Sequence, residues 1–472
     1  MVESLSAGEQ TLVAGRIDSA SNSVITAFTV ASISLIIYGV FYPGLINFDT
    51  AEMLNQSMLG YCRDWHSPTI VLIWRLLNLV VPGPASLLGL GLLLFSASAL
   101  YLAQSNTVRL FPCLAILALL CLWPPLLNAL VVVGKDQLFI TCLMLFIALS
   151  FATLRNGRLT RTTPVWLAPL LFVAAGVRQD SVVLLLPGLF LLYRLPRGRS
   201  LAGWDRKMAG TMAVLSVLAA GVAVKLSNNF VAHAEREFPF QTTQVHDLAG
   251  ISVQTDLFLI PSYADPGFDL TTVKQRYSPR TGDPLMFFPG QPNLQITNLK
   301  ERAHDLHALW TDSVFRHPRA YLQHRFDSFT YLLGIEDPLS WQLYQLDTDV
   351  TMHAAYPLLT DVNISNPDNA ALAYYRKSVI PALESTPMFR GYAYDLVFLL
   401  EIGLALWRRR SMQDRLIIAL GCGVVLHQSL LFFVSPAALF RYLYPTILIC
   451  LVMTILTLTR GASQGRDRQL TA

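Results

Sequence analysis

The fold of this chain is decided by residues 110 to 154, which read LFPCLAILALLCLWPPLLNALVVVGKDQLFITCLMLFIALSFATL. Two apolar runs, 110 to 133 and 137 to 154, lie on either side of a turn that contains Lys135 and Asp136. A helix needs roughly 20 apolar residues to cross the ~30 Å hydrocarbon core of a bilayer. Because runs of this length recur along the sequence, we predict an all-α polytopic membrane protein.

The composition supports a membrane class and excludes others. Of the 472 residues, 53% are hydrophobic and only 14% are charged, whereas soluble domains carry about 25% charged residues. The formal net charge is +4, and no basic stripe with interleaved aromatic residues occurs. A nucleic-acid-binding function is therefore excluded.

The apolar runs predict about ten spanning helices. The first is expected to be a retained helix and not a removed signal peptide, because no small-x-small cleavage site follows it. A shorter run, 68 to 81, is expected to lie in the membrane interface. The predicted spans are 24 to 43, 85 to 104, 110 to 133, 137 to 154, 164 to 177, 181 to 195, 208 to 228, 391 to 407, 414 to 434 and 440 to 459.

Charge in the short loops predicts the orientation of these helices. Cytoplasmic loops of membrane proteins are enriched in Lys and Arg. With a cytoplasmic N-terminus, the short internal loops carry thirteen Lys and Arg residues and the short external segments carry five. Both termini are therefore predicted to be cytoplasmic. The segment 44 to 84, the turns near 135, 178 and 435 to 441, and the region 229 to 390 would then face outward.

Three parts follow from this topology. Residues 1 to 228 form an N-terminal transmembrane module, whose first external loop, 44 to 84, is the candidate catalytic loop. Residues 229 to 390 are predicted to form one large external, periplasmic domain, because they are rich in aromatic residues and Pro and lack a long low-complexity run. Residues 391 to 472 form the last transmembrane helices and a cytoplasmic tail.

The first external loop contains two acids, Asp49 and Glu52, whose spacing of three places them on one face of a short helix. Carboxylates at a membrane surface can act as a general base on a bound acceptor. The alternative is a helix-capping Asp and a solvated Glu. Asp64 and His66 follow in the same loop, before the predicted interfacial helix.

The other outward turns also carry charge. Lys135 and Asp136 open one span, Arg178 lies in the next outward turn, and Arg441 and Tyr442 lie in the last. Single charged residues at helix ends often snorkel to the headgroups. Here several turns bring acids and cations to the same membrane face. Such a group of charges could bind an anionic lipid phosphate beside a reacting hydroxyl or amine. No metal site is predicted, because His304 and His307 have a helical spacing typical of metal ligands but the sequence gives no signal for a third ligand.

At these residues the chain resembles the C-type (GT-C) membrane glycosyltransferases, the superfamily of the protein O-mannosyltransferases and the lipid A aminoarabinose transferases. The resemblance lies in the Asp-x-x-Glu of the first loop, Asp64-Trp65-His66-Ser67-Pro68, the Asp136 that opens a span, Gly176-Val177-Arg178-Gln179-Asp180, and Phe440-Arg441-Tyr442-Leu443-Tyr444-Pro445. Ser67 stands where the mannosyltransferases carry Pro, and the two loop acids are not adjacent. These departures leave the acceptor open: lipid A, a glycan or a protein.

The resemblance implies transfer of a sugar from a polyprenyl-phosphate donor to an acceptor, with inversion, at the outer face of a bacterial inner membrane. It implies no cofactor, and its partners are the lipid-linked donor and membrane lipid. The implied catalytic residues are Asp49 as the base, Asp136 to orient a substrate and Glu52 in support. The implied substrate-binding residues are His66, Asp64, Lys135, Arg178, Arg441 and Tyr442. Two other functions remain: a transporter or flippase of lipid-linked sugars, and a polysaccharide polymerase or ligase.

Overall fold

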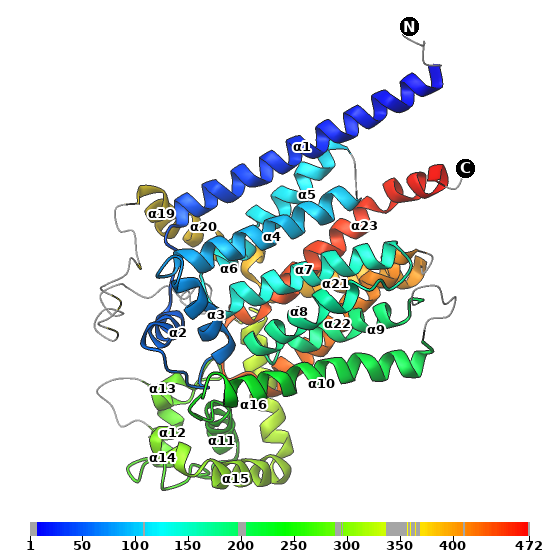
Figure 1. Cartoon of the computed structure of the whole chain (residues 1–472). Helices are drawn as coiled ribbons and strands as arrows, with labels where there is room; N and C mark the ends of the chain where they lie inside the picture. The colour runs from blue at the N-terminus through cyan, green and yellow to red at the C-terminus, as the bar shows by residue number, and fades with distance from the viewer. Residues whose placement is uncertain are drawn as a thin grey trace.

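The structure is a computed structural model of the whole chain. It describes residues 7–106, 109–196, 204–287, 294, 296–336, 356, 359, 364, 369–408 and 411–470. Within these ranges the secondary structure is helical, with three isolated β-bridges and no β-strand. The helices form one bundle with a smaller helical unit at one end (Figure 1).

Six helical segments of the described chain are long and apolar enough to cross a membrane. This number confirms an α-helical polytopic membrane protein. The helices involved are α1 (Ala7–Phe41), α4 (Ala85–Asn106), α7 (Lys135–Arg155), α10 (Arg206–Phe230), α22 (Met412–Val434) and α23 (Tyr444–Leu470). Within α1, only residues 21–41 are apolar enough to span. The last spanning segment begins in the short helix η5 (Phe440–Leu443) and ends at residue 460 of α23.

The remaining predicted spans are shorter or interrupted. Helices α5 (Leu110–Leu122) and α6 (Pro124–Val131) meet at an angle of 56°, because proline lacks an N–H and its ring clashes with the preceding turn. Helix α8 (Thr163–Val177) has 15 residues and is therefore ~22 Å long. The η1 (Val182–Leu185) and α9 (Leu186–Tyr193) pair is shorter still. The total of ten spans stays a prediction.

Helix α21 (Gly391–Arg408) also matches a predicted span. It carries Asp395 and Glu401, and the Glu401 side chain is buried and accepts a hydrogen bond from Thr457 of α23. An acid inside an apolar helix is expected to have such a polar partner.

The first predicted loop folds into two helices that are too short to span, α2 (Phe48–Leu59) and α3 (Pro68–Asn78). Ser67 caps α3 by accepting a hydrogen bond from the backbone of Ile70, as expected for a serine before a helix-opening proline. Trp74 is fully buried and donates a hydrogen bond to the Gly83 carbonyl. The short helix expected over 68 to 81 is confirmed, although it ends earlier.

The region 229 to 390 contains a helical unit with its own core, which we call the polar unit (residues 241–332). Buried side chains between Val245 and Leu306, among them Leu248 and Phe268, form a hydrophobic cluster separate from that of the bundle, whereas Leu332 at the end of the unit joins the core of the bundle. Its helices are α11 (Gln241–Thr255), α12 (Leu270–Arg276), α13 (Asp283–Met286), α14 (Ile296–Glu301), α15 (Ala303–Arg316) and α16 (Pro318–Leu332).

The end of that region behaves differently, because its buried side chains join the core of the bundle. Leu372, Tyr375 and Phe389 belong to this core, and Tyr375 packs edge-to-face on Phe41 of α1. The elements concerned are α19 (Ala370–Tyr374), η3 (Tyr375–Val379), α20 (Ile380–Glu384) and η4 (Pro387–Phe389). Trp341 and Tyr344, which contribute to the predicted domain, lie outside the described residues.

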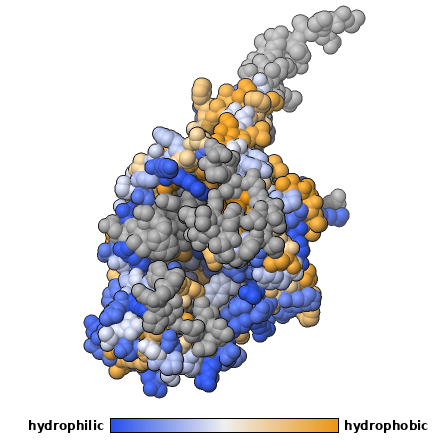
Figure 2. All heavy atoms as spheres, turned by 90° about the vertical axis from the view of Figure 1, so that its left-hand side faces the viewer, coloured by the Kyte–Doolittle hydropathy of each residue, from blue (hydrophilic) through white to orange (hydrophobic). Residues whose placement is uncertain are grey.

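The two ends of the bundle differ in what they carry. Figure 1 shows α2, α3 and the polar unit at one end and both chain termini at the other. Seen from the first end, hydrophobic side chains gather on α1, and hydrophilic side chains predominate on the lower part, where the polar unit lies (Figure 2). Lys135 and Arg155 stand at opposite ends of α7, whose 21 residues extend over ~31 Å.

Candidate active site

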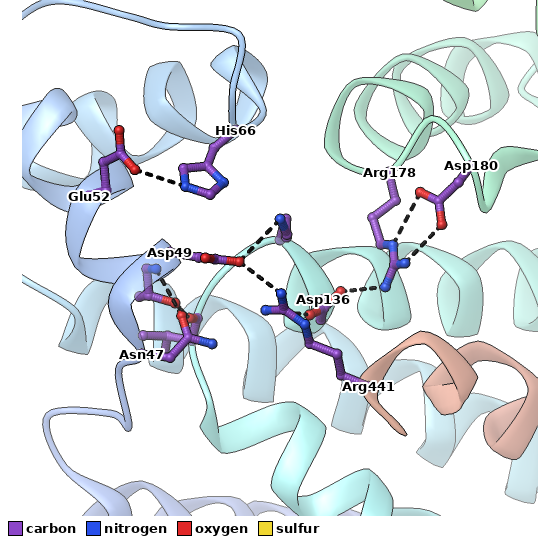
Figure 3. Close-up of polar contacts among 11 residues, drawn as sticks. Asn47, Asp49, Glu52, His66, Asp136, Arg178, Asp180 and Arg441 are labelled. Carbon is purple, nitrogen blue, oxygen red and sulfur yellow. Dashed lines mark hydrogen bonds and ion pairs between the residues drawn. The ribbon is translucent and has the colours of Figure 1, made fainter. Parts of the chain in front are cut away.

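Four segments that are far apart in the sequence bring charged side chains together at the end of the bundle near α2 (Figure 3). The first turn of α2 supplies Asp49, and the first turn of α7 supplies Lys135 and Asp136. The end of α8 supplies Arg178, and η5 supplies Arg441, which lies 392 positions after Asp49. The convergence of these five residues, expected from sequence, is what the structure shows.

Local capping explains why Asp49 faces this cluster. Asn47 is the N-cap of α2, and its side chain accepts the backbone N–H of Thr50 at 2.9 Å. Asp49 is therefore not the capping residue, and its carboxylate is available at the positive end of the helix. The alternative interpretation of Asp49 as a helix cap is wrong.

The turn before α7 is fastened directly to the start of α2. The Thr50 hydroxyl donates to the Val133 carbonyl at 2.7 Å, and the Val133 N–H donates to the Leu45 carbonyl at 2.9 Å. Gly134 has φ of 143°, a conformation that favours glycine, and a Cβ there would lie 3.0 Å from the Thr50 hydroxyl. A close approach of the two segments thus places Lys135 beside Asp49.

Asp49 is the centre of the ion pairs. Its Oδ2 lies 2.9 Å from Nη2 of Arg441 and 3.4 Å from Nζ of Lys135. The side chains of Asp49, Arg441 and Lys135 are 28%, 13% and 23% exposed. Burial favours the neutral acid, but the charges of Arg441 and Lys135 outweigh it and hold the pKa of Asp49 well below its usual range.

Arg178 is held between two other carboxylates. Its Nη1 donates to Asp136 at 2.5 Å and its Nη2 donates to Asp180 at 2.8 Å, while its side chain is only 5% exposed. Burial alone would raise the pKa of Asp180, but the charge of Arg178 lowers it. The Tyr442 ring lies near both guanidinium groups, 5.2 Å from that of Arg178 and 5.7 Å from that of Arg441, within the range of cation–π attraction.

Glu52 and His66 form a second pair beside Asp49 (Figure 3). The Nε2 atom of His66 lies 3.0 Å from Oε2 of Glu52, and Gln56 donates to Oε1 of Glu52 at 3.2 Å. Burial opposes ionisation of Glu52, but the hydrogen bond with His66 lowers its pKa. His66 itself is buried. Glu52 and His66 therefore lie close to Asp49, as expected from the sequence.

Asp64 is engaged elsewhere. Its Oδ1 accepts the backbone N–H of Glu237 at 2.5 Å, and its own N–H donates to the Glu235 carbonyl at 2.9 Å. Burial raises the pKa of Asp64. Asp64 thus ties the first loop to the segment before the polar unit, and among the described residues it makes no hydrogen bond or ion pair with the Asp49 cluster.

Sequence reasoning missed a carboxylate of the polar unit, Asp283. It is half-buried, and its pKa is raised by burial and by the negative charge of Asp49, while Arg441 acts in the opposite sense. Asp283 follows a segment fixed to the turn that carries Arg441: Ala438 donates to the Arg280 carbonyl at 2.6 Å. In the sequence it lies in a Pro- and Gly-containing turn, which gives no sign of this placement.

A second missed residue is His427, which is fully buried in α22. Its Nε2 lies 3.1 Å from the hydroxyl of Ser181, which also donates to Asp180 at 3.0 Å. A lone His in an apolar span is a sequence signal for a functional or structural polar contact. Here His427 is linked through the Ser181 hydroxyl to Asp180, the partner of Arg178.

The chemistry open to this cluster follows from its charges. Three cations and several carboxylates meet in a partly exposed place, so an anionic ligand can exchange with a carboxylate as the partner of a cation. In the described chain, no group of three or more His, Cys, Asp or Glu side chains is arranged to hold a metal ion.

Comparison with known proteins adds no family. No protein-family model, curated protein or solved structure matches this chain.

Proposed function

We propose that this protein is a glycosyltransferase that moves a sugar from a polyprenyl-phosphate donor to an acceptor. The observation that carries the proposal is the contact of one carboxylate, Asp49, with two cations, Arg441 and Lys135, in a partly exposed position. Such a site can hold a phosphate and a proton-accepting group side by side, as this transfer requires.

The three cations have different tasks in this proposal. Arg178 is almost fully buried and already bonded to Asp136 and Asp180, so we assign it to holding Asp136 in place. Lys135 is more exposed and makes a longer contact. The Nε atom of Arg441 is buried and has no hydrogen-bond partner among the described residues. We therefore assign the donor phosphate to Arg441 and Lys135.

Binding of the donor would then activate the base. The phosphate attracts Arg441 and Lys135, which weakens their hold on Asp49, and the pKa of Asp49 rises toward its ordinary value. Asp49 takes the proton of the acceptor hydroxyl or amine as its oxygen or nitrogen attacks the anomeric carbon. The bond from that carbon to the phosphate oxygen breaks, and polyprenyl phosphate leaves with the electron pair. Attack opposite to the leaving group inverts the sugar.

The proposal also assigns a side of the membrane. The cluster lies at the Lys135 end of α7, and the loop with Arg155, Arg158 and Arg161 follows the other end of this helix. By the positive-inside tendency, the cluster and the polar unit would face outward, with both termini in the cytoplasm. We accordingly propose about ten spans, an external polar unit and a bacterial inner membrane as the location, where a lipid-linked donor is available.

A transporter or flippase is the principal alternative. Transporters bind their substrates near the membrane midplane, whereas this cluster lies at one end of the bundle. Glu401 and His427 are ionisable residues within helices, but both are buried and have polar partners, Thr457 and Ser181. A polymerase or ligase would share the proposed chemistry and differ only in the acceptor.

The experiment compares donor types with purified protein in nanodiscs. A radiolabelled polyprenyl-phosphate sugar and the matching nucleotide sugar are each incubated with a cell-envelope extract as the source of acceptor. We expect label to move only from the lipid-linked donor, and Asp49→Asn to abolish most of this transfer. Transfer from the nucleotide sugar alone would refute the proposal. Movement of the intact labelled lipid across proteoliposomes, with no new bond formed, would favour a flippase.

A further inference from the structure

The polar unit is fastened to the turn that carries Arg441. This turn, residues 433–441, connects α22 with η5 and α23. Tyr321 of α16 donates to the Phe433 carbonyl at 3.2 Å, and Thr243 of α11 donates to the Val434 carbonyl at 3.3 Å. At the far side of the turn, Ala438 donates to the Arg280 carbonyl at 2.6 Å. The polar unit thus contacts the turn along most of its length.

A buried ion pair stands at the centre of this contact. Arg325 of α16 and Asp247 of α11 have side chains that are 1% and 0% exposed. Arg325 donates through Nη2 to Asp247 at 2.7 Å and through Nη1 to the Ser435 carbonyl at 2.7 Å. Trp310 donates to the same Asp247 oxygen at 2.7 Å. One guanidinium group therefore joins two helices of the polar unit to the end of α22.

The cost of burying these charges indicates that the arrangement is specific. A buried charge pair is stabilising only when its geometry and extra hydrogen bonds offset the loss of hydration. Ser435 is the C-cap of α22, so its carbonyl has no hydrogen-bond partner within the helix. Arg325 supplies a charged donor to this carbonyl. Such charge-assisted bonds are stronger than neutral ones and fix the direction in which the turn leaves the helix.

We infer that Arg325 is a positioning residue for Arg441: it holds the 433–441 turn so that the Arg441 guanidinium reaches Asp49 and the donor phosphate. Arg441 lies only six positions after Ser435, and extended residues and one short helical turn connect them. A change in the direction of this turn therefore moves the guanidinium away from Asp49. The role of the phosphate in this inference rests on the proposed function. The hold of Arg325 on the 433–441 turn does not depend on it.

The test uses Arg325→Lys in the full-length protein. Lysine keeps the charge that Asp247 needs but cannot bond to Asp247 and Ser435 through two separate nitrogens. The matched control is Arg316→Lys, an exposed residue of α15 whose partner is Asp312. If Arg325→Lys fails to fold, Tyr321→Phe with Thr243→Val removes two of the hydroxyl bonds to the turn and leaves the buried charges in place.

Two quantities are measured. Amide hydrogen exchange of residues 437–443 is expected to become about tenfold faster in Arg325→Lys, with α7 unchanged. Binding of a fluorescent polyprenyl phosphate is expected to weaken by about tenfold, while Arg316→Lys matches the wild type in both. Unchanged exchange, or faster exchange with unchanged binding, would overturn the inference. If the wild type binds no polyprenyl phosphate, the proposed function fails. The exchange result alone then decides whether Arg325 holds the 433–441 turn.

Discussion

Arg441→Gln is the substitution that distinguishes a phosphate-binding cation from a structural ion pair. In the structure Arg441 contacts Asp49 at 2.9 Å and approaches Asp136 at 3.9 Å. Glutamine keeps a hydrogen-bond donor but removes the charge. Loss of one donor aimed at a developing oxyanion lowers turnover by about 10² to 10³, which is ~2.7–4 kcal/mol.

Binding should change less than turnover. Two unit charges 4 Å apart near a protein surface interact by about 4 kcal/mol, but Arg441 has Asp49 as a partner before the donor binds and the phosphate afterwards. The two attractions largely cancel in the binding equilibrium. Charge that develops on the leaving phosphate has no such compensation. We therefore expect kcat to fall by about 10² to 10³ and the Kd of the donor to rise by only about tenfold.

The assay is transfer from the lipid-linked donor at saturating concentration, together with equilibrium binding of fluorescent polyprenyl phosphate. Lys135→Gln should have a smaller effect, because its contact with Asp49 is longer, 3.4 Å, and its side chain is 23% exposed. Arg316→Gln serves as the remote control. Turnover of Arg441→Gln close to the wild-type value, in a protein that binds donor normally, would refute the assignment of Arg441 to the leaving phosphate.

Three further predictions test the cluster and the polar unit. Asp49→Asn should lower turnover by about 10² to 10⁴ without weakening donor binding, because it removes the carboxylate that competes with the phosphate for Arg441 and Lys135; normal turnover would transfer the role of base to another carboxylate. Arg178→Gln should lower the unfolding temperature more than Arg441→Gln, because it leaves Asp136 and Asp180 without their closest cation; a differential scanning measurement in detergent decides this. Burial and the neighbouring His324 lower the pKa of His246 to about 3 from 6.5, so the unfolded state binds its proton first. Protonation of His246 therefore leaves the free energy of unfolding unchanged above pH ~6.5 and lowers it by about 1.4 kcal/mol per pH unit between pH ~6.5 and pH 3. In thermal unfolding between pH 7 and pH 5, His246→Gln should flatten this dependence.

The sequence alone predicted the helices well where the pattern is local. Long apolar runs identified α4, α7, α10 and α22 as helices long enough to span, because a helix in hydrocarbon satisfies its own backbone hydrogen bonds. The break between α5 and α6 was missed, although Pro124 and Pro125 mark it. A hydropathy pattern measures length and composition and does not report where a helix bends.

The same sequence showed which charged residues lie near helix ends, but it did not show which acid contacts which cation. Asp64 and Asp49 occur in one loop, yet Asp64 binds the backbone of Glu237 and Asp49 binds Arg441. Asp283 lies near enough for the charges of Asp49 and Arg441 to act on its pKa, because the polar unit docks on the turn at 433–441. Ion pairs depend on distances of a few ångström between segments up to 392 positions apart, and those distances exist only once helices and turns pack together. Local pattern determined the helices and the charge at their ends, while tertiary packing decided which cation faces which carboxylate.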